Sequence, residues 1–214
     1  MTPRSVARQR GKSAIMANLD FWLYTVHGAF WATFGATRII LRWRSRKVPA
    51  ESAPSSQQEH TAPYSRALVA FHGIAFFAMY LGIGNAVIPG RVPFWFRGQR
   101  FVGTIVIAGC AALMAWALVY FQSWRFRAKL DEHHQLATGG PFRTVRHPIY
   151  MGLNMLALGS AIWVPTAILW FACLLMAIGS DLRARAEETL LETAFGQPYR
   201  DYRTRTRRFV PGIY

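Results

Sequence analysis

Acidic residues, lysine and cysteine are all scarce in this sequence. Its 214 residues include 10 Asp and Glu and two Cys, and charged residues of both signs make up only 16%. So few cysteines exclude a disulfide-stabilised scaffold, and Cys110 and Cys173 do not have the spacing of metal ligands. The low charge and the 52% apolar content exclude a disordered chain and an ordinary soluble domain with one basic face.

The basic residues lie between long apolar runs. The formal net charge is +15, yet the mean hydropathy is +0.14. A nucleic-acid-binding groove would interleave basic with aromatic residues, and the sequence has no such pattern. The combination predicts a small all-α, polytopic membrane protein whose partner is the lipid bilayer, with no nucleic acid and no metal.

Five membrane helices are predicted. Three come from continuous apolar runs of about 20 residues, the length that crosses a bilayer. These runs are Leu19–Leu41, Ala67–Pro89 and Phe101–Phe121. A longer apolar block contains Pro165 near its middle, which predicts a helical hairpin of Pro148–Trp163 and Pro165–Ser180. Each arm is short, so the hairpin either crosses at a tilt or enters only part of the bilayer.

The chain divides into three predicted parts. Residues 1–18 form a basic disordered tail, residues 19–129 hold the first three helices, and residues 130–214 form a C-terminal segment with a loop, the hairpin and a helical tail. Of the 25 basic residues, 18 fall on the side of this tail, which predicts that this side is cytoplasmic. Twenty-two Arg against three Lys favour a GC-rich bacterial source, and hence a bacterial inner membrane over the endoplasmic reticulum.

Two polar segments flank the hairpin and share the cytoplasmic side. The first contains the turn Gly139-Gly140-Pro141 and ends in Arg146, His147 and Tyr150. In the second, Arg183 and Glu187 share one helix face. These residues fit either a membrane anchor with a solvated ion pair or a functional site, because the hairpin brings its two ends together.

The same segments resemble a known family. The run Gly140-Pro-Phe-Arg-Thr-Val-Arg-His-Pro-Ile-Tyr150 precedes Arg183-x-x-x-Glu187-Glu188, Phe195-Gly196-x-x-Tyr199-x-x-Tyr202 and Arg208-Phe-Val-Pro211. This order and spacing closely resemble the isoprenylcysteine carboxyl methyltransferases, which lie within a wider group of integral-membrane methyltransferases that includes phospholipid N-methyltransferases. The resemblance covers roughly residues 130–214, which makes this the predicted catalytic segment.

The resemblance implies S-adenosylmethionine as the methyl donor, bound between the cytoplasmic helix ends and the C-terminal segment. The positions that match its cofactor contacts are His134, Gln135, Leu136, Ala137, Phe142, His147, Pro148, Ile149, Tyr150 and Glu187. The substrate-contacting Arg matches Arg183. Ala137 replaces a larger apolar residue and Phe142 replaces a Tyr, so one hydroxyl is lost.

The acceptor group decides which side chains are needed for catalysis. A carboxylate is ionised at neutral pH and needs only a cation to orient it, a role predicted for Arg183 with Arg146 as a second cation. An amine would need a base, for which Glu188 or His147 is available. We therefore predict transfer to the carboxylate of a lipid-modified, isoprenylcysteine-like acceptor, with a lipid amine as the second candidate.

Two other classes share the multi-helix form. A membrane reductase of sterol-type lipids would bind NADPH more tightly than S-adenosylhomocysteine, and would need a basic site for the 2′-phosphate. A non-enzymatic membrane scaffold would retain its function after Arg183→Ala or Glu187→Ala.

Overall fold

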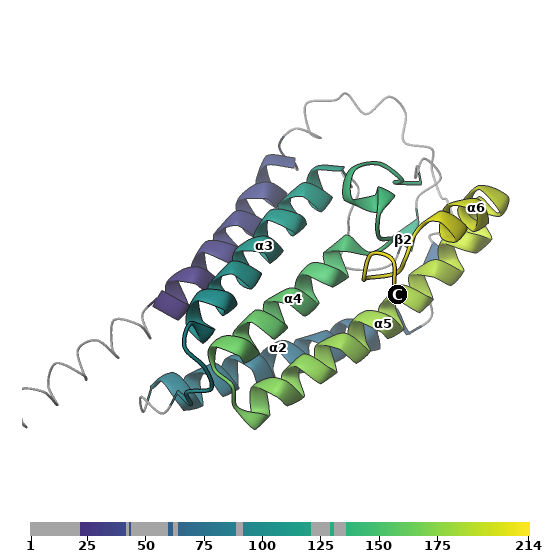
Figure 1. The fold of residues 1–214 in the computed structure, drawn as a ribbon. Coiled ribbons are helices and arrows are strands. Elements are labelled where there is room, and N and C mark those ends of the chain that lie inside the picture. Colours follow the sequence, from purple (N-terminus) through teal and green to yellow (C-terminus); the bar gives the residue numbers. More distant parts are fainter. Residues whose placement is uncertain are drawn as a thin grey trace, which may run out of the picture.

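The structure is a computed structural model that describes residues 22–41, 43, 60–61, 64–88, 92–120, 129–130 and 136–214. These residues are mostly helical (Figure 1). A helix covers residues 22–41 and is followed by α2 (Ser65–Val87), α3 (Gln99–Tyr120), α4 (Pro148–Trp163), α5 (Ala167–Phe195) and α6 (Gln197–Arg205). A 3-10 turn, η1, spans Gly140–Arg143, and two short antiparallel strands, β1 (His60–Thr61) and β2 (Lys129–Leu130), pair with each other.

The predicted hairpin is confirmed, with one change at its turn. The first arm, α4, has the predicted bounds, because Pro148 begins a helix well and Val164, directly before Pro165, leaves the helical conformation with φ −122° and ψ 81°. The second arm begins at Ala167, two residues later than predicted, because Thr166 is extended. This arm then continues without a break to Phe195. The predicted disordered tail, residues 1–18, lies outside the described residues.

Three described helices are long and apolar enough to cross a membrane: Arg66–Val87, Gln99–Tyr120 and Ala167–Phe195. Their outward faces carry large apolar side chains such as Phe77, Phe101 and Phe171, each more than half exposed. Water would disfavour such surfaces, whereas acyl chains solvate them. The protein is therefore an integral membrane protein. With 16 residues, α4 is about one turn shorter than a typical span.

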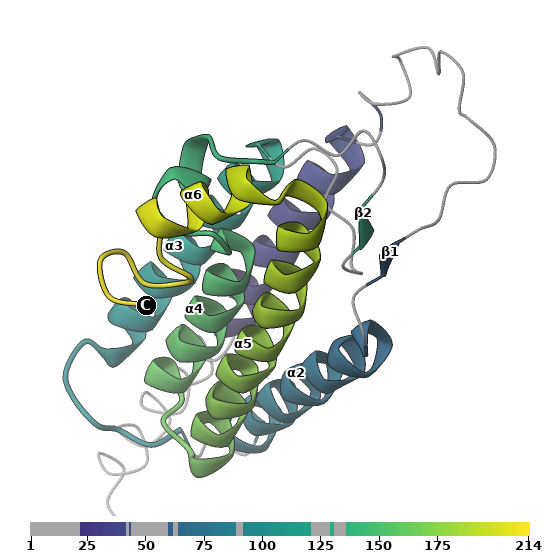
Figure 2. The ribbon, with the colours of Figure 1, turned by 90° about the vertical axis from the view of Figure 1, so that its right-hand side faces the viewer.

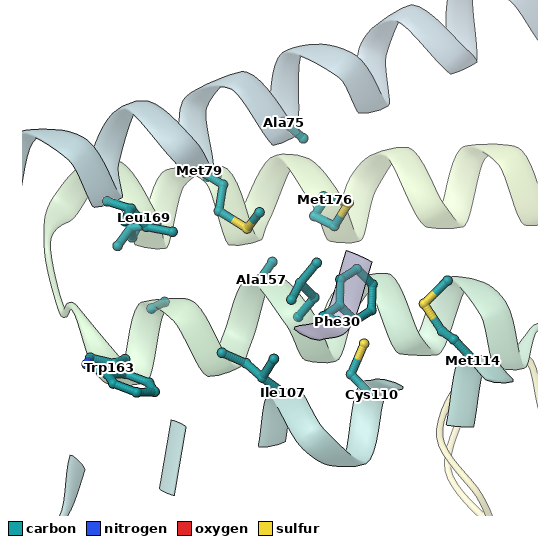
Figure 3. Close-up of a cluster of buried hydrophobic side chains, with 14 of the residues drawn as sticks. Phe30, Ala75, Met79, Ile107, Cys110, Met114, Ala157, Trp163, Leu169 and Met176 are labelled. Carbon is teal, nitrogen blue, oxygen red and sulfur yellow. The ribbon is translucent and has the colours of Figure 1, made fainter. Parts of the chain in front are cut away.

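The short helix α4 is central in the bundle. It packs between α3 and α5, and α2 packs on α5 (Figures 1 and 2). Close approach to α3 depends on Gly159, because a Cβ there would lie 2.8 Å from Cγ1 of Ile107. Side chains from the helices then meet in one apolar core that includes Phe30, Met79 and Met176 (Figure 3).

Polar side chains join the helices inside this core. His27 pairs with the Tyr80 hydroxyl through Nδ1 at 3.1 Å and with the Ser160 hydroxyl through Nε2, also at 3.1 Å. Nearer the other end, the Ser180 hydroxyl donates to Asn154 at 3.0 Å. Such bonds in an apolar medium fix the rotation of each helix, because an unpaired polar group there is unfavourable.

Candidate active site

The hairpin places the start of α4 beside the second half of α5. The Tyr150 hydroxyl donates a hydrogen bond to Oε1 of Glu187. Nδ1 of His147 lies 3.6 Å from the other oxygen of the same carboxylate. The Arg183 guanidinium lies over the Tyr150 ring, 5.0 Å from its centre, and its Nη2 is 4.0 Å from Glu187. The structure therefore brings together residues 33 or more positions apart in sequence, as the hairpin predicted.

The C-terminal segment holds the approach to α4 in place. Its backbone runs parallel to residues 144–147, with the Arg146 amide donating to the Arg207 carbonyl at 2.7 Å and the His147 amide donating to Arg208 at 3.1 Å. The Arg207 amide donates back to Thr144 at 3.4 Å. Because these bonds are between backbone groups, they set the position of His147 independently of its side chain.

A buried carboxylate, Glu188, ties these parts together. It accepts hydrogen bonds from Nε of Arg146 at 2.9 Å and from Nη2 of Arg208 at 2.8 Å, and it lies 3.2 Å from Nε2 of His147. Burial by itself would raise the pKa of Glu188, but the bonds from His147 and Arg208 outweigh burial, so the pKa lies well below its ordinary value. Glu188 is thus ionised and holds Arg146, Arg208 and His147 in place. This geometry favours a positioning role for Glu188 over the predicted role of a base.

Arg146 is also engaged by the protein itself. In addition to Glu188, its Nη1 donates to the Thr206 carbonyl at 2.6 Å and to the Arg203 carbonyl at 3.3 Å. A guanidinium held in this way is rigid and turned toward the C-terminal segment. These contacts favour a positioning role for Arg146 over the predicted role of holding an anionic substrate.

A cavity opens next to Glu187, on the α4 side. The residues that line it are Leu136, Ala137, Phe142, Arg146, His147, Pro148, Ile149, Tyr150, Glu187, Leu191, Tyr199 and Tyr202. Eight of them are predicted cofactor contacts, and the remaining two predicted contacts, His134 and Gln135, lie outside the described residues. Arg183 does not line the cavity, and its guanidinium covers the Tyr150 ring beside it.

The predicted Gly-Gly-Pro turn shapes one wall of this cavity. Gly140 has φ +56°, and a Cβ there would lie 2.6 Å from the Tyr120 ring, so only glycine fits both the backbone and the contact. The turn leads into η1, which buries Phe142 against the cavity. The Phe142 carbonyl accepts a 2.7 Å hydrogen bond from the Tyr202 hydroxyl, which fixes α6 to η1.

Sequence reasoning did not assign roles to four residues that the structure places at this site. Leu191, Tyr199 and Tyr202 line the cavity, and Arg208 holds Glu188. Leu191 follows Glu187 by four residues and so shares its helix face, which is a signal available in the sequence. The other three belong to the quoted C-terminal motifs, whose positions against α4 depend on tertiary contacts.

The cavity has the chemistry that a methyl donor with an amino-acid tail requires. Its walls are mostly apolar and aromatic, which suits a flat heterocycle. Glu187 contributes a carboxylate at one side, which suits a cationic group. The residues present therefore fit the donor that the sequence predicts.

Comparison with known proteins agrees with this geometry. A family model described as phospholipid methyltransferase matches residues 98–198. Protein-S-isoprenylcysteine O-methyltransferase B of Arabidopsis thaliana is 30% identical over 129 residues, which cover 58% of this chain and 64% of that protein. A probable protein-S-isoprenylcysteine O-methyltransferase of Oryza sativa subsp. indica is 27% identical over 143 residues, or 64% of this chain and 73% of that protein.

Over these residues the chain is similar to membrane methyltransferases. It spans slightly less than two thirds of the length of the Arabidopsis protein. The matched residues of the family model run from the start of α3 to the start of α6, and they include Tyr150, Arg183 and Glu187. Tyr199, Tyr202 and Arg208 follow the matched residues.

Proposed function

We propose that this protein transfers a methyl group from S-adenosylmethionine to the carboxylate of a lipid-modified, isoprenylcysteine-like acceptor. The observation that carries the proposal is the cavity at the end of the hairpin, where Glu187 and Tyr150 meet beside the buried Arg183. The names of the Arabidopsis and Oryza relatives support the same acceptor chemistry.

In this proposal the cavity residues hold the donor. When bound, S-adenosylmethionine supplies a methyl group on a cationic sulfur. Glu187, oriented by the Tyr150 hydroxyl, faces the positive groups of the donor, and Phe142, Ile149 and Leu191 form an apolar slot for its base. His134 and Gln135 complete the proposed set of contacts. The largely apolar walls reduce the contact of a bound donor with water, which strengthens the attraction between Glu187 and a cation.

Arg183 is proposed to hold the acceptor. It lies one helical turn before Glu187 on α5, on the side toward the apolar part of that helix. An acceptor that enters laterally from the bilayer therefore meets Arg183 before it meets the donor cavity. A guanidinium binds a carboxylate through two parallel hydrogen bonds, which would aim one oxygen at the donor.

The second candidate acceptor, a lipid amine, is favoured by the description of the family model. An amine must lose a proton, and the two predicted bases are poorly suited to accept one. Glu188 is bound by two arginines and His147. Burial by itself would lower the pKa of His147, but its bonds to Glu187 and Glu188 outweigh burial and raise the pKa. Both nitrogens of its ring already face these two carboxylates. This arrangement favours the carboxylate acceptor.

The proposed setting is a membrane crossed by five helices, including helix 22–41 and the hairpin. The count of basic residues supports a cytoplasmic position for the cavity, where the donor is available, and the excess of Arg over Lys supports a bacterial inner membrane.

Labelling with two acceptors tests the proposal. The purified full chain in lipid nanodiscs is incubated with S-adenosylmethionine radiolabelled in the methyl group and with either a farnesylcysteine analogue or phosphatidylethanolamine. We expect base-labile label, which marks an ester, on the farnesylcysteine analogue only. Base-stable label on the phospholipid would instead establish the amine acceptor. Label on neither acceptor would refute both substrates.

A further inference from the structure

One polar group in the donor cavity has no protein partner in the described part of the chain. The Tyr199 side chain is fully buried, and its hydroxyl makes no hydrogen bond to any described residue. Burial of a hydroxyl without a partner is unfavourable, so a buried tyrosine nearly always directs its O–H to an acceptor. Because Tyr199 lines the cavity, the acceptor it lacks can be supplied by whatever fills that cavity.

The place of Tyr199 in the fold restricts which part of a ligand it can reach. α6 follows α5 directly, and the Tyr202 hydroxyl ties α6 to the carbonyl of Phe142. The Tyr199 ring lies beside the Tyr202 ring, with 6.2 Å between their centres, so Tyr199, Tyr202 and Phe142 form one aromatic part of the cavity wall. The carboxylate in the lining comes from Glu187 on α5, where it accepts from Tyr150. Aromatic side chains suit a flat heterocycle, and Tyr199 belongs to this aromatic part of the wall.

The ionisation of Tyr199 fits the role of a donor. Burial, together with the neighbouring Glu188 carboxylate, raises the pKa of its phenol above the ordinary value. The phenol therefore stays protonated at neutral pH and has a hydrogen to donate. Purine nitrogens and ribose oxygens are acceptors, so an adenosine group supplies the matching chemistry.

We propose that the Tyr199 hydroxyl donates a hydrogen bond to the adenosine moiety of the methyl donor and makes α6 the wall that selects this moiety. The inference rests on the proposed function, since it assumes an adenosine-containing donor in this cavity. It concerns recognition of the donor and is independent of which acceptor is methylated.

The test compares Tyr199→Phe with Tyr202→Phe in the full chain in detergent. Affinities for S-adenosylhomocysteine and 5′-methylthioadenosine are measured by calorimetry, and the thermal midpoint is measured without ligand. Tyr199→Phe is expected to lower the affinity for both ligands about three- to ten-fold, which is the effect of one neutral hydrogen bond. It is expected to leave the thermal midpoint unchanged or to raise it. Tyr202→Phe breaks an existing internal bond and is expected to lower the midpoint.

Several outcomes would overturn the inference. Unchanged affinity for both ligands in Tyr199→Phe would show that the hydroxyl contacts neither of them. Weaker binding of S-adenosylhomocysteine alone would place the hydroxyl at the amino-acid part of the donor, and a lower midpoint for Tyr199→Phe would assign it a structural bond. If the wild-type chain binds neither ligand, the proposed function fails and this inference fails with it.

Discussion

At the scale of single residues, the role of Arg183 can be tested, because a cation at this site can have two functions. It is buried, and its guanidinium covers the Tyr150 ring, so it can support the donor cavity from outside or bind an acceptor directly. If Arg183 only supports the cavity, its removal should weaken binding of the donor. If it binds the acceptor, its removal should lower kcat/KM for the acceptor and leave the affinity for the donor largely unchanged.

We expect Arg183→Ala to lower kcat/KM for the farnesylcysteine analogue about 30-fold or more, because it removes one partner of a desolvated ion pair. The affinity for S-adenosylhomocysteine should change by less than about two-fold. Steady-state methylation and calorimetry on the same preparation give both values. Arg185→Ala is the matched control, since Arg185 lies two residues further along α5 with a 61% exposed side chain. An equal loss of donor affinity in Arg183→Ala would contradict the acceptor role.

At the scale of elements, sequence and structure agree where the cause is local. α4 has its predicted bounds because Pro148 and the turn before Pro165 define both ends. The Gly139-Gly140-Pro141 turn is present for the same reason. The roles of Arg146 and Glu188 were not predictable in this way, because they depend on Arg208 and on the C-terminal segment beside residues 144–147. Those contacts join distant parts of the chain and leave no periodic signal.

The opposite end of the hairpin is held by another element contact that periodicity does not reveal. Gln99, at the start of α3, is buried, and its side-chain amide donates to the carbonyls of Pro93 at 2.9 Å and Trp163 at 3.0 Å. Its side-chain oxygen accepts from the Trp95 amide at 2.7 Å. One side chain therefore connects the loop before α3 to the last turn of α4.

We expect Gln99→Leu to lower the free energy of unfolding by about 3 kcal/mol, because several buried backbone groups lose their partners at once. Gln197→Leu, an exposed position in α6, should change it by less than about 0.5 kcal/mol. Unfolding of the full chain in mixed micelles, followed by circular dichroism, measures both. Equal stability of Gln99→Leu and the wild type would show that these bonds do not hold the hairpin.

At the scale of the whole molecule, charge has two separate uses. Most of the +15 net charge belongs to basic residues near helix ends, and their distribution supports the proposed orientation. A smaller set, Arg146 and Arg208, surrounds Glu188 inside the protein and joins the start of α4, α5 and the C-terminal segment. The stability of this junction depends on pH, because its anion and the His147 ring both titrate.

The two titrations affect stability in opposite directions. The pKa of Glu188 is lowered on folding, so its contribution is present above its ordinary value of 4.5 and is lost as the pH falls below that value. The pKa of His147 is raised on folding, so its contribution is complete below its ordinary value of 6.5 and is lost as the pH rises through the higher value of the folded state. The junction is therefore most stable between about pH 5 and pH 6.5.

Glu188→Gln should flatten this profile at both ends, because it removes the anion that holds His147 and the two arginines. At pH 6 we expect it to lower the free energy of unfolding by about 3–5 kcal/mol, the effect of leaving buried cations without their partner. Glu192→Gln is the control, since Glu192 lies one turn further along α5 and pairs with the exposed Arg200 and Arg203. Thermal midpoints of the three proteins between pH 4 and pH 9 give the comparison. A pH profile of Glu188→Gln that runs parallel to that of the wild type would rule out this junction as the origin of the pH dependence.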